Sequence, residues 1–126
     1  MERHDGGVAV VTLSEEAARN AFSRASIHEM SNVLGSLLDD STCKAIVLTG
    51  TARFFCTGAD IDEFADSIDD GSIGNLVDEL TSVLHPLELR LRRSPTVFIA
   101  AINGSAAGGG FCLLYTSPSP RDLYQS

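Results

Sequence analysis

The stretch from Ser94 to Gly110 constrains the fold more than any other part of the chain. Pro95 ends the preceding element, and residues 96–102 form a short apolar run with several β-branched side chains, which is typical of a buried β-strand. Side chains then almost disappear through the glycines and alanines that follow. A backbone without side chains can approach another element or a ligand closely. We therefore predict a buried strand that leads into a glycine-rich turn.

The three consecutive glycines from Gly108 to Gly110 allow two interpretations. If they open a helix, their N–H groups lack partners within the helix and can stabilise a developing negative charge. A tight packing turn without a ligand is the alternative. Residues 95–114 also imitate a membrane-spanning helix, but Asn103, Ser105 and several glycines make it a poor one. We therefore expect no membrane association.

Composition limits the class of protein and its partners. The chain has 126 residues, of which 44% are hydrophobic and 21% charged, as in a single folded domain. Its net charge of −8 repels a phosphate backbone, so we expect no nucleic acid partner. Cys43, Cys56 and Cys112 have no Cys-x-x-Cys spacing, which favours reduced thiols over disulfides or a metal site. The N-terminus lacks the apolar segment of a signal peptide, so we expect a cytoplasmic protein.

The N-terminal half predicts a strand, a helix and a second strand in succession. Residues 8–13 and residues 44–48 are apolar, β-branched runs of strand type. Between them, Ser26 and Glu29 have capping-box spacing, and apolar residues recur at helical intervals until Asp40. This order predicts a parallel pair of strands joined by a crossover helix of about three turns.

A second junction between a strand and a helix follows Phe54–Cys56. Asp60 suits the N-cap of a short helix through Phe64, and the acidic residues that follow it suit the positive end of the helix dipole. Residues 66–74 are acidic and contain glycine, and we predict a mobile surface loop there.

Apolar residues that recur between residues 73 and 87 predict a second amphipathic helix, interrupted or kinked at Pro86. Its C-terminal end carries basic residues that suit the helix dipole or, alternatively, contact an acidic ligand such as a nucleotide phosphate: Arg90, Arg92 and Arg93. The histidines have no obvious carboxylate or cysteine partner in the sequence, and we expect them to be surface histidines or histidines with satisfied hydrogen bonds: His4, His28 and His85.

Residues 112–126 differ in character from the chain before them. They show no periodicity and contain two Ser-Pro pairs. The run from Cys112 to Asp122 also resembles the translated sequencing-adaptor tails that end some assembled gene fragments. We interpret residues 112–126 as a non-native tail, with a genuine disordered tail as the alternative.

Three motifs in this order closely resemble the crotonase superfamily, the enoyl-CoA hydratases and isomerases of fatty acid metabolism: Arg19–Phe22, Phe55–Ile61 and Ile99–Gly110. The resemblance covers about residues 8–111. It implies that residues 1–111 are the N-terminal part of a crotonase-like acyl-CoA-binding domain roughly twice as long as this chain. The implied α/β fold is the repeated β-β-α superhelix of the ClpP/crotonase class, incomplete at the C-terminus. Full-length relatives are commonly trimers or hexamers, so we expect a homo-oligomer.

The resemblance also implies a substrate and a binding site. The substrate is a coenzyme A thioester, and no further cofactor is expected. Its carbonyl oxygen would lie between the backbone N–H groups of Ala59 and Gly109, an oxyanion hole that stabilises the enolate by about 10²–10³ in rate for each donor. The residues implied to line the CoA groove are Ala59, Asp60, Ile61 and Asp62, with main-chain groups around Asp60 and Ile61 near the adenine end.

Two departures from the family pattern bear on the reaction. Hydratases of this family place a glutamate two residues after the glycine triplet, where this chain has Cys112, and a second glutamate beyond the end of this chain. Asp62 stands where some relatives have lysine, so we expect no charge contact to CoA from that position. The loop at Ala18 and Arg19 is a weaker candidate for that contact.

The resulting expectation is an acyl-CoA-transforming enzyme of the hydratase/isomerase type, whose fragment alone is inactive and prone to aggregate through exposed apolar faces. A catalytically silent acyl-CoA-binding module or an inactive fragment is the alternative. A serine protease of the related Clp-type fold ranks lower, because Ser105 is the one candidate nucleophile and no histidine follows His85.

Overall fold

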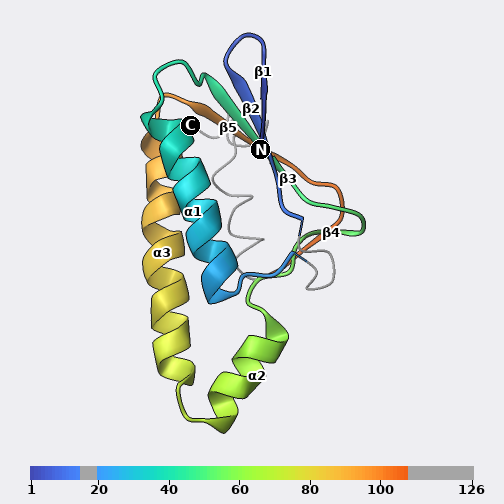
Figure 1. Ribbon diagram of the computed structural model, residues 1–126, viewed down its shortest axis with the longest axis vertical. Coiled ribbons are helices and arrows are strands. Elements are labelled where there is room, and N and C mark those ends of the chain that lie inside the picture. The colour runs from blue at the N-terminus through green and yellow to red at the C-terminus, as the bar shows by residue number, and fades with distance from the viewer. Residues whose placement is uncertain (15–19, 108–126) are drawn as a thin grey trace, which may run out of the picture.

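The computed structural model describes residues 1–14 and 20–107 of the chain and shows strands packed against helices (Figure 1). The larger sheet has four strands in the order β1-β2-β3-β5. Its members are β1 (Glu2–His4), β2 (Val8–Thr12), β3 (Ala45–Thr49) and β5 (Val97–Ala101). β1 pairs antiparallel with β2, whereas β2, β3 and β5 are parallel. A two-stranded parallel sheet joins β4 (Phe54–Cys56) and β6 (Ser105–Ala106).

The described helices are α1 (Arg24–Asp39), α2 (Ile61–Asp69) and α3 (Ile73–Arg93). α1 and α3 lie side by side and run in the same direction, and α2 lies beyond their N-terminal ends (Figure 1). The parallel pair β2 and β3 with α1 as the crossover confirms the predicted strand-helix-strand unit. None of the described helices is long and apolar enough to cross a membrane.

The core lies between one face of the larger sheet and the two long helices. Ala9, Ile46 and Phe98 contribute from neighbouring strands, and buried leucines of α1 and α3 pack on them. β5 was predicted to be wholly buried, and this prediction is wrong for one face. Phe98 is only 2% exposed, whereas Val97 is 48% and Ile99 43% exposed. Successive strand residues point to opposite faces, and in the described part of the chain the two long helices cover one of them.

α1 begins earlier than the predicted capping box between Ser26 and Glu29. Ser23 is the N-cap, and its hydroxyl accepts a hydrogen bond from the Ser26 backbone N–H at 3.1 Å. The Ser26 hydroxyl in turn accepts from the Ser23 N–H at 2.9 Å, so Ser26 fills the role that a glutamate has in the usual box. The helix is therefore 16 residues long, more than the predicted three turns, and ends at Asp39 as expected.

The predicted mobile loop over residues 66–74 is wrong. α2 continues through Asp69 and α3 begins at Ile73, so only a short turn separates them. Ser67 is buried and donates to the Glu63 carbonyl at 2.8 Å, which satisfies its hydroxyl within the helix. In the turn, Asp70 Oδ1 accepts from the Ser72 N–H at 2.9 Å and lowers the conformational freedom of the connection.

α3 runs through Pro86, which contradicts the predicted interruption at this residue but not the kink that was its alternative. A proline removes one backbone hydrogen bond, but apolar side chains on both sides of it remain buried in the core and hold the helix together. These are Leu76, Leu80, Leu84, Leu87 and Leu91. The predicted basic last turn is confirmed, and Arg90 pairs there with Asp39 of α1.

Replacing Leu34 by alanine tests this core. Leu34 lies on α1 and has no exposed surface, so the substitution leaves a cavity and should cost about 2–5 kcal/mol in the free energy of unfolding. Leu89→Ala is the matched control, because Leu89 is 50% exposed and should change stability by about 0.5 kcal/mol or less. Urea unfolding monitored by circular dichroism measures both. Equal losses would contradict the core described here.

Candidate functional site

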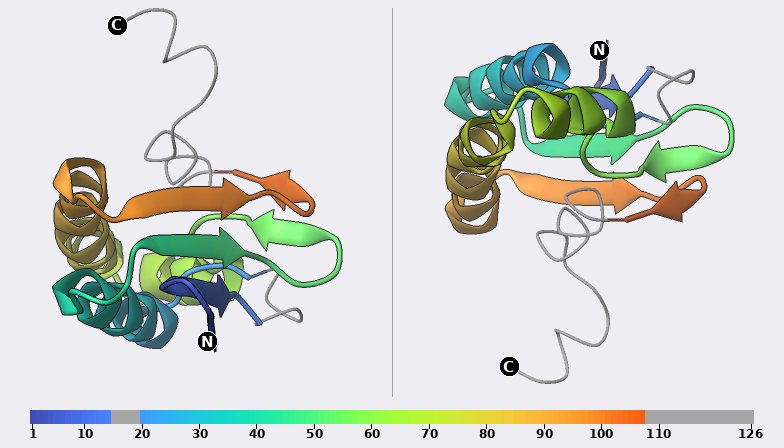
Figure 2. Two further views of the ribbon diagram at one scale, coloured as in Figure 1. Left: turned by 90° about the horizontal axis from the view of Figure 1, so that it is seen from above. Right: turned by 90° about the horizontal axis from the view of Figure 1, so that it is seen from below.

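Two segments that are far apart in the sequence lie side by side at the end of the parallel strands (Figure 2). In the small sheet, β4 pairs with β6, with Phe54 opposite Ser105. The Ser105 N–H donates to the Arg53 carbonyl at 3.1 Å, and the Ala107 N–H donates to the Cys56 carbonyl at 3.0 Å. The second and third motifs of the sequence therefore meet in the fold.

The first motif joins them through Phe22. Its N–H donates to the Gly58 carbonyl at 2.5 Å, and its carbonyl accepts from the Asp60 N–H at 2.9 Å. These two bonds form a parallel bridge between Phe22 and Ala59. In such a bridge the bonds use the residues on either side of Ala59, so the Ala59 N–H points away from Phe22. Within residues 1–14 and 20–107, this N–H donates to no backbone acceptor.

Gly58 allows the chain to turn immediately before Ala59. Its φ of +91° lies in the left-handed region, which glycine adopts without steric cost. The residue is buried, and Ala59 beside it is half-buried. A half-buried amide that points away from the neighbouring strand can donate a hydrogen bond to a ligand oxygen. The other expected donor, Gly109, lies outside the described residues, as do Ala18, Arg19 and Cys112.

The expected CoA-lining residues occupy the start of α2. Asp60 is the N-cap, as predicted: its Oδ1 accepts from the backbone N–H groups of Asp62 at 2.9 Å and Glu63 at 3.1 Å. The side chains of Ile61 and Asp62 are exposed. Because the first turn of α2 is acidic, it repels phosphate groups and leaves the main chain as the more suitable contact surface.

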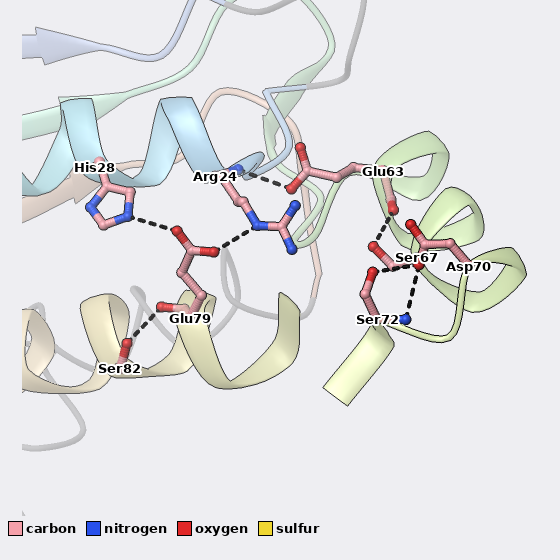
Figure 3. Close-up of polar contacts among 8 residues, drawn as sticks. All are labelled: Arg24, His28, Glu63, Ser67, Asp70, Ser72, Glu79 and Ser82. Atoms are coloured by element: carbon pink, nitrogen blue, oxygen red, sulfur yellow. Dashed lines mark hydrogen bonds and ion pairs between the residues drawn. The ribbon is translucent and has the colours of Figure 1, made fainter. Parts of the chain in front are cut away.

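A polar network joins α2 to both long helices (Figure 3). Glu63 accepts from the Arg24 backbone N–H at 3.0 Å, and the Arg24 Nε lies 2.6 Å from Glu79 on α3. Glu79 also contacts the exposed His28 at 3.2 Å, in agreement with the expectation of a surface or satisfied histidine. Hydrogen bonds from His28 and then from Arg24 lower the pKa of Glu79. Sequence reasoning missed this network because its members come from three separate helices.

Ser105 receives no support as a nucleophile. It is exposed on β6, and the histidine contacts within the described ranges join His28 to Glu79 and His4 to Glu2 at 3.5 Å. Neither contact brings an imidazole to Ser105. The described part of the chain also contains no cluster of three or more histidine, cysteine or acidic side chains that could hold a metal ion.

Cys56 ends β4 and is completely buried. Burial raises the pKa of its thiol to about 11, and a hydrogen bond from the Gly58 backbone offsets only part of that effect. The thiol is therefore protonated and uncharged near neutral pH, and it is a poor nucleophile.

The raised pKa of Cys56 predicts slow alkylation. At pH 8 iodoacetamide should label Cys56 at least about tenfold more slowly in the folded protein than in urea, because the reactive thiolate is scarce and shielded. The thiol pKa is higher in the folded state than in the unfolded state, so protonated Cys56 favours the folded state. This contribution to the free energy of unfolding is present below about pH 9 and is lost as the pH rises toward 11. Peptide mass spectrometry measures the labelling. Equal rates in both states would contradict the buried, protonated thiol.

Comparison with known proteins supports these observations. Residues 3–117 match the family model described as enoyl-CoA hydratase/isomerase. The chain is 36% identical over 103 residues to a 2,3-dehydroadipyl-CoA hydratase of Escherichia coli, covering 82% of this chain and 38% of that protein. It is 37% identical over 109 residues to a short-chain-enoyl-CoA hydratase of Clostridium acetobutylicum, covering 84% and 39% respectively. The chain thus spans about two fifths of the length of these curated relatives.

Solved structures show the same fold. A Pseudomonas aeruginosa protein superposes with a TM-score of 0.80 at 31% identity, over 91% of this chain and 48% of that one. An enoyl-CoA hydratase from Bacillus anthracis gives a TM-score of 0.71 at 31% identity, over 86% and 41%. These matches confirm the predicted α/β crotonase fold. The chain belongs to the enoyl-CoA hydratase/isomerase family.

Proposed function

We propose that this chain is part of an enzyme that binds an acyl-CoA thioester and stabilises its enolate through two backbone N–H groups. The observation that carries the proposal is the bridge between Phe22 and Ala59, which turns the Ala59 N–H away from Phe22. The family supplies the substrate class, since its named members are hydratases of CoA thioesters.

In the proposed site, Ala59 and Gly109 donate to the thioester carbonyl oxygen. Negative charge develops on that oxygen when a proton leaves the carbon next to the carbonyl, and fixed donors stabilise it without having to reorganise. The pairing of β6 with β4 supports this proposal, because β6 precedes Gly109 in the sequence by three residues and β4 precedes Ala59 by three.

The CoA part of the substrate would lie along the start of α2. The Asp60 carboxylate caps the helix, and the Asp60 N–H and carbonyl already bond Phe22 and Phe64, so the main chain of Ile61 is the group that we assign to the adenine. Asp62 adds a negative charge, which places the CoA phosphates away from this turn. The remaining expectations stay proposals: a cytoplasmic homo-oligomer, a family domain over residues 1–111, and a non-native tail over residues 112–126.

A silent acyl-CoA-binding module is the alternative, and one observation favours it. If residues 112–126 belong to the native protein, Cys112 occupies the position at which hydratases of this family carry a glutamate, and the chain has no group for proton transfer there. Binding of CoA thioesters without turnover by the complete gene product would support this alternative. Turnover of a short-chain 2-enoyl-CoA would support the enzyme.

Replacing Gly109 by proline tests the oxyanion hole. Proline removes the N–H, and turnover of a short-chain 2-enoyl-CoA by the complete gene product should fall by about 10²–10³ or more. The hydration is followed by loss of absorbance of the enoyl thioester. Gly74→Ala is the control, since a Cβ at Gly74 meets no atom within 4 Å and should leave turnover unchanged. Unchanged turnover in Gly109→Pro would overturn the assignment of this amide.

A further inference from the structure

We propose that Asn20 and Asn103 are positioning residues that hold the two arms of the site at a fixed spacing by sharing one acceptor, the Phe54 carbonyl. Here the first arm is the ladder of Phe22 with Gly58–Asp60, and the second arm is Ser105–Ala107. The catalytic meaning of this inference rests on the proposed function. The hydrogen bonds themselves do not.

The Phe54 carbonyl accepts two side-chain hydrogen bonds, one from a residue that precedes Phe54 in the sequence and one from a residue that follows it. Asn20 Nδ2 donates at 2.8 Å, and Asn103 Nδ2 donates at 3.1 Å. A carbonyl oxygen has two lone pairs, so both bonds can form together. Asn20 lies just before Phe22 in the first arm, and Asn103 lies just before Ser105 in the second.

Asn20 is placed for donation. Its side chain is 2% exposed, and its Nδ2 lies 3.5 Å from the Thr51 carbonyl as well as against Phe54. Its Oδ1 is buried with no partner in the described ranges. The reversed amide would direct Oδ1 at two carbonyl oxygens, so the observed orientation is the favourable one. Burial of an unpaired oxygen costs free energy, which indicates that the donor group is what the position requires.

Asn103 ties the second arm to the loop before β4. Its Oδ1 accepts from the Gly50 N–H at 2.9 Å, and its Nδ2 also donates to the Ala52 carbonyl at 3.0 Å. With its bond to the Phe54 carbonyl, this single side chain bonds two backbone groups of the loop and one of β4. A side chain that satisfies several backbone groups fixes the loop conformation as a turn would.

Two glycines pack against the peptide groups on either side of the Phe54 Cα. A Cβ at Gly104 would lie 1.9 Å from the Arg53 carbonyl oxygen, and one at Gly50 would lie 2.2 Å from the Phe54 carbonyl oxygen. Only glycine leaves room for so close an approach. Phe54 is thus held by packing on two sides and by both asparagines, and a shift of its carbonyl displaces both arms.

The first test is hydrogen exchange of backbone amides in the complete gene product, comparing Asn20→Asp and Asn103→Asp with the wild type. Aspartate keeps the shape and tolerates the left-handed φ of +56° at position 20, but it lacks the donors. If the acceptor is shared, Asn20→Asp should speed exchange of the Ser105 and Ala107 amides, in the second arm, at least about tenfold. Asn103→Asp should speed exchange of the Phe22 and Asp60 amides, in the first arm, by a similar factor. Faster exchange confined to each residue's own arm would overturn the proposal.

Thr96→Val is the matched control for this test. Thr96 is 8% exposed and donates to the Cys43 carbonyl at 3.4 Å, at the opposite end of β5 from the site. Losing that bond should leave exchange in both arms unchanged. If Thr96→Val speeds exchange in both arms as much as the asparagine variants do, the effect is general destabilisation and the shared acceptor is refuted.

Kinetics separate positioning from binding. Each aspartate variant should lower kcat for a 2-enoyl-CoA by about 10–10²-fold, because a displaced donor no longer meets the oxyanion. The Kd of free CoA, which lacks the thioester carbonyl, should change less than about twofold, since it does not use the oxyanion hole. Equal losses in kcat and CoA affinity would refute a positioning role.

The double variant and the wild type complete the experiment. The double variant Asn20→Asp/Asn103→Asp should have a kcat only slightly below that of the less active single variant, because both residues act through one oxygen. Fully additive losses would contradict the shared acceptor. A wild type that neither binds CoA nor turns over any enoyl-CoA would refute the proposed function, and the exchange measurements would still decide whether the two asparagines hold both arms.

Discussion

The close approach of three backbones around Phe54 is the constraint on which the candidate site depends. The 50–54 loop, β4 and the segment that contains Gly104 lie so near one another that a Cβ at Gly50 or Gly104 would overlap backbone atoms. This contact sets the pairing of β4 with β6, and the pairing sets where the second arm runs. Gly50 and Gly104 are therefore required for packing, and this requirement is separate from the role of the triplet Gly108–Gly110.

The larger sheet shows how unevenly this chain buries its apolar residues. α1 and α3 cover one face, where the leucines of both helices meet β2, β3 and β5. On β5 the other face keeps Val97 and Ile99 partly exposed, and Ile102 beyond it is 56% exposed. Apolar residues on both faces made this strand look wholly buried in the sequence. Alternation along a strand reports which residues share a face, but it does not report what covers that face.

Local patterns predicted most of the elements correctly because they depend on neighbours in the sequence. The crossover unit, the N-cap at Asp60 and the basic end of α3 follow from periodicity, capping and dipole rules that act within a few residues. The errors arose where longer-range packing overrode a local signal. Pro86 stays helical because leucines on both sides are held in the core, and the acidic region after Asp66 is helical for a further turn.

The sequence by itself determined the family, the order of β2, α1, β3 and β5, and the two motifs of small residues that a thioester site requires, but it did not indicate β1 or β6. Tertiary structure alone decided how these motifs meet. The direction of the Ala59 amide depends on a bridge to Phe22, and the spacing of the arms depends on two asparagine side chains that reach one carbonyl. Such contacts join residues that are distant along the chain, and their geometry is fixed only when the backbone folds and excludes water from them.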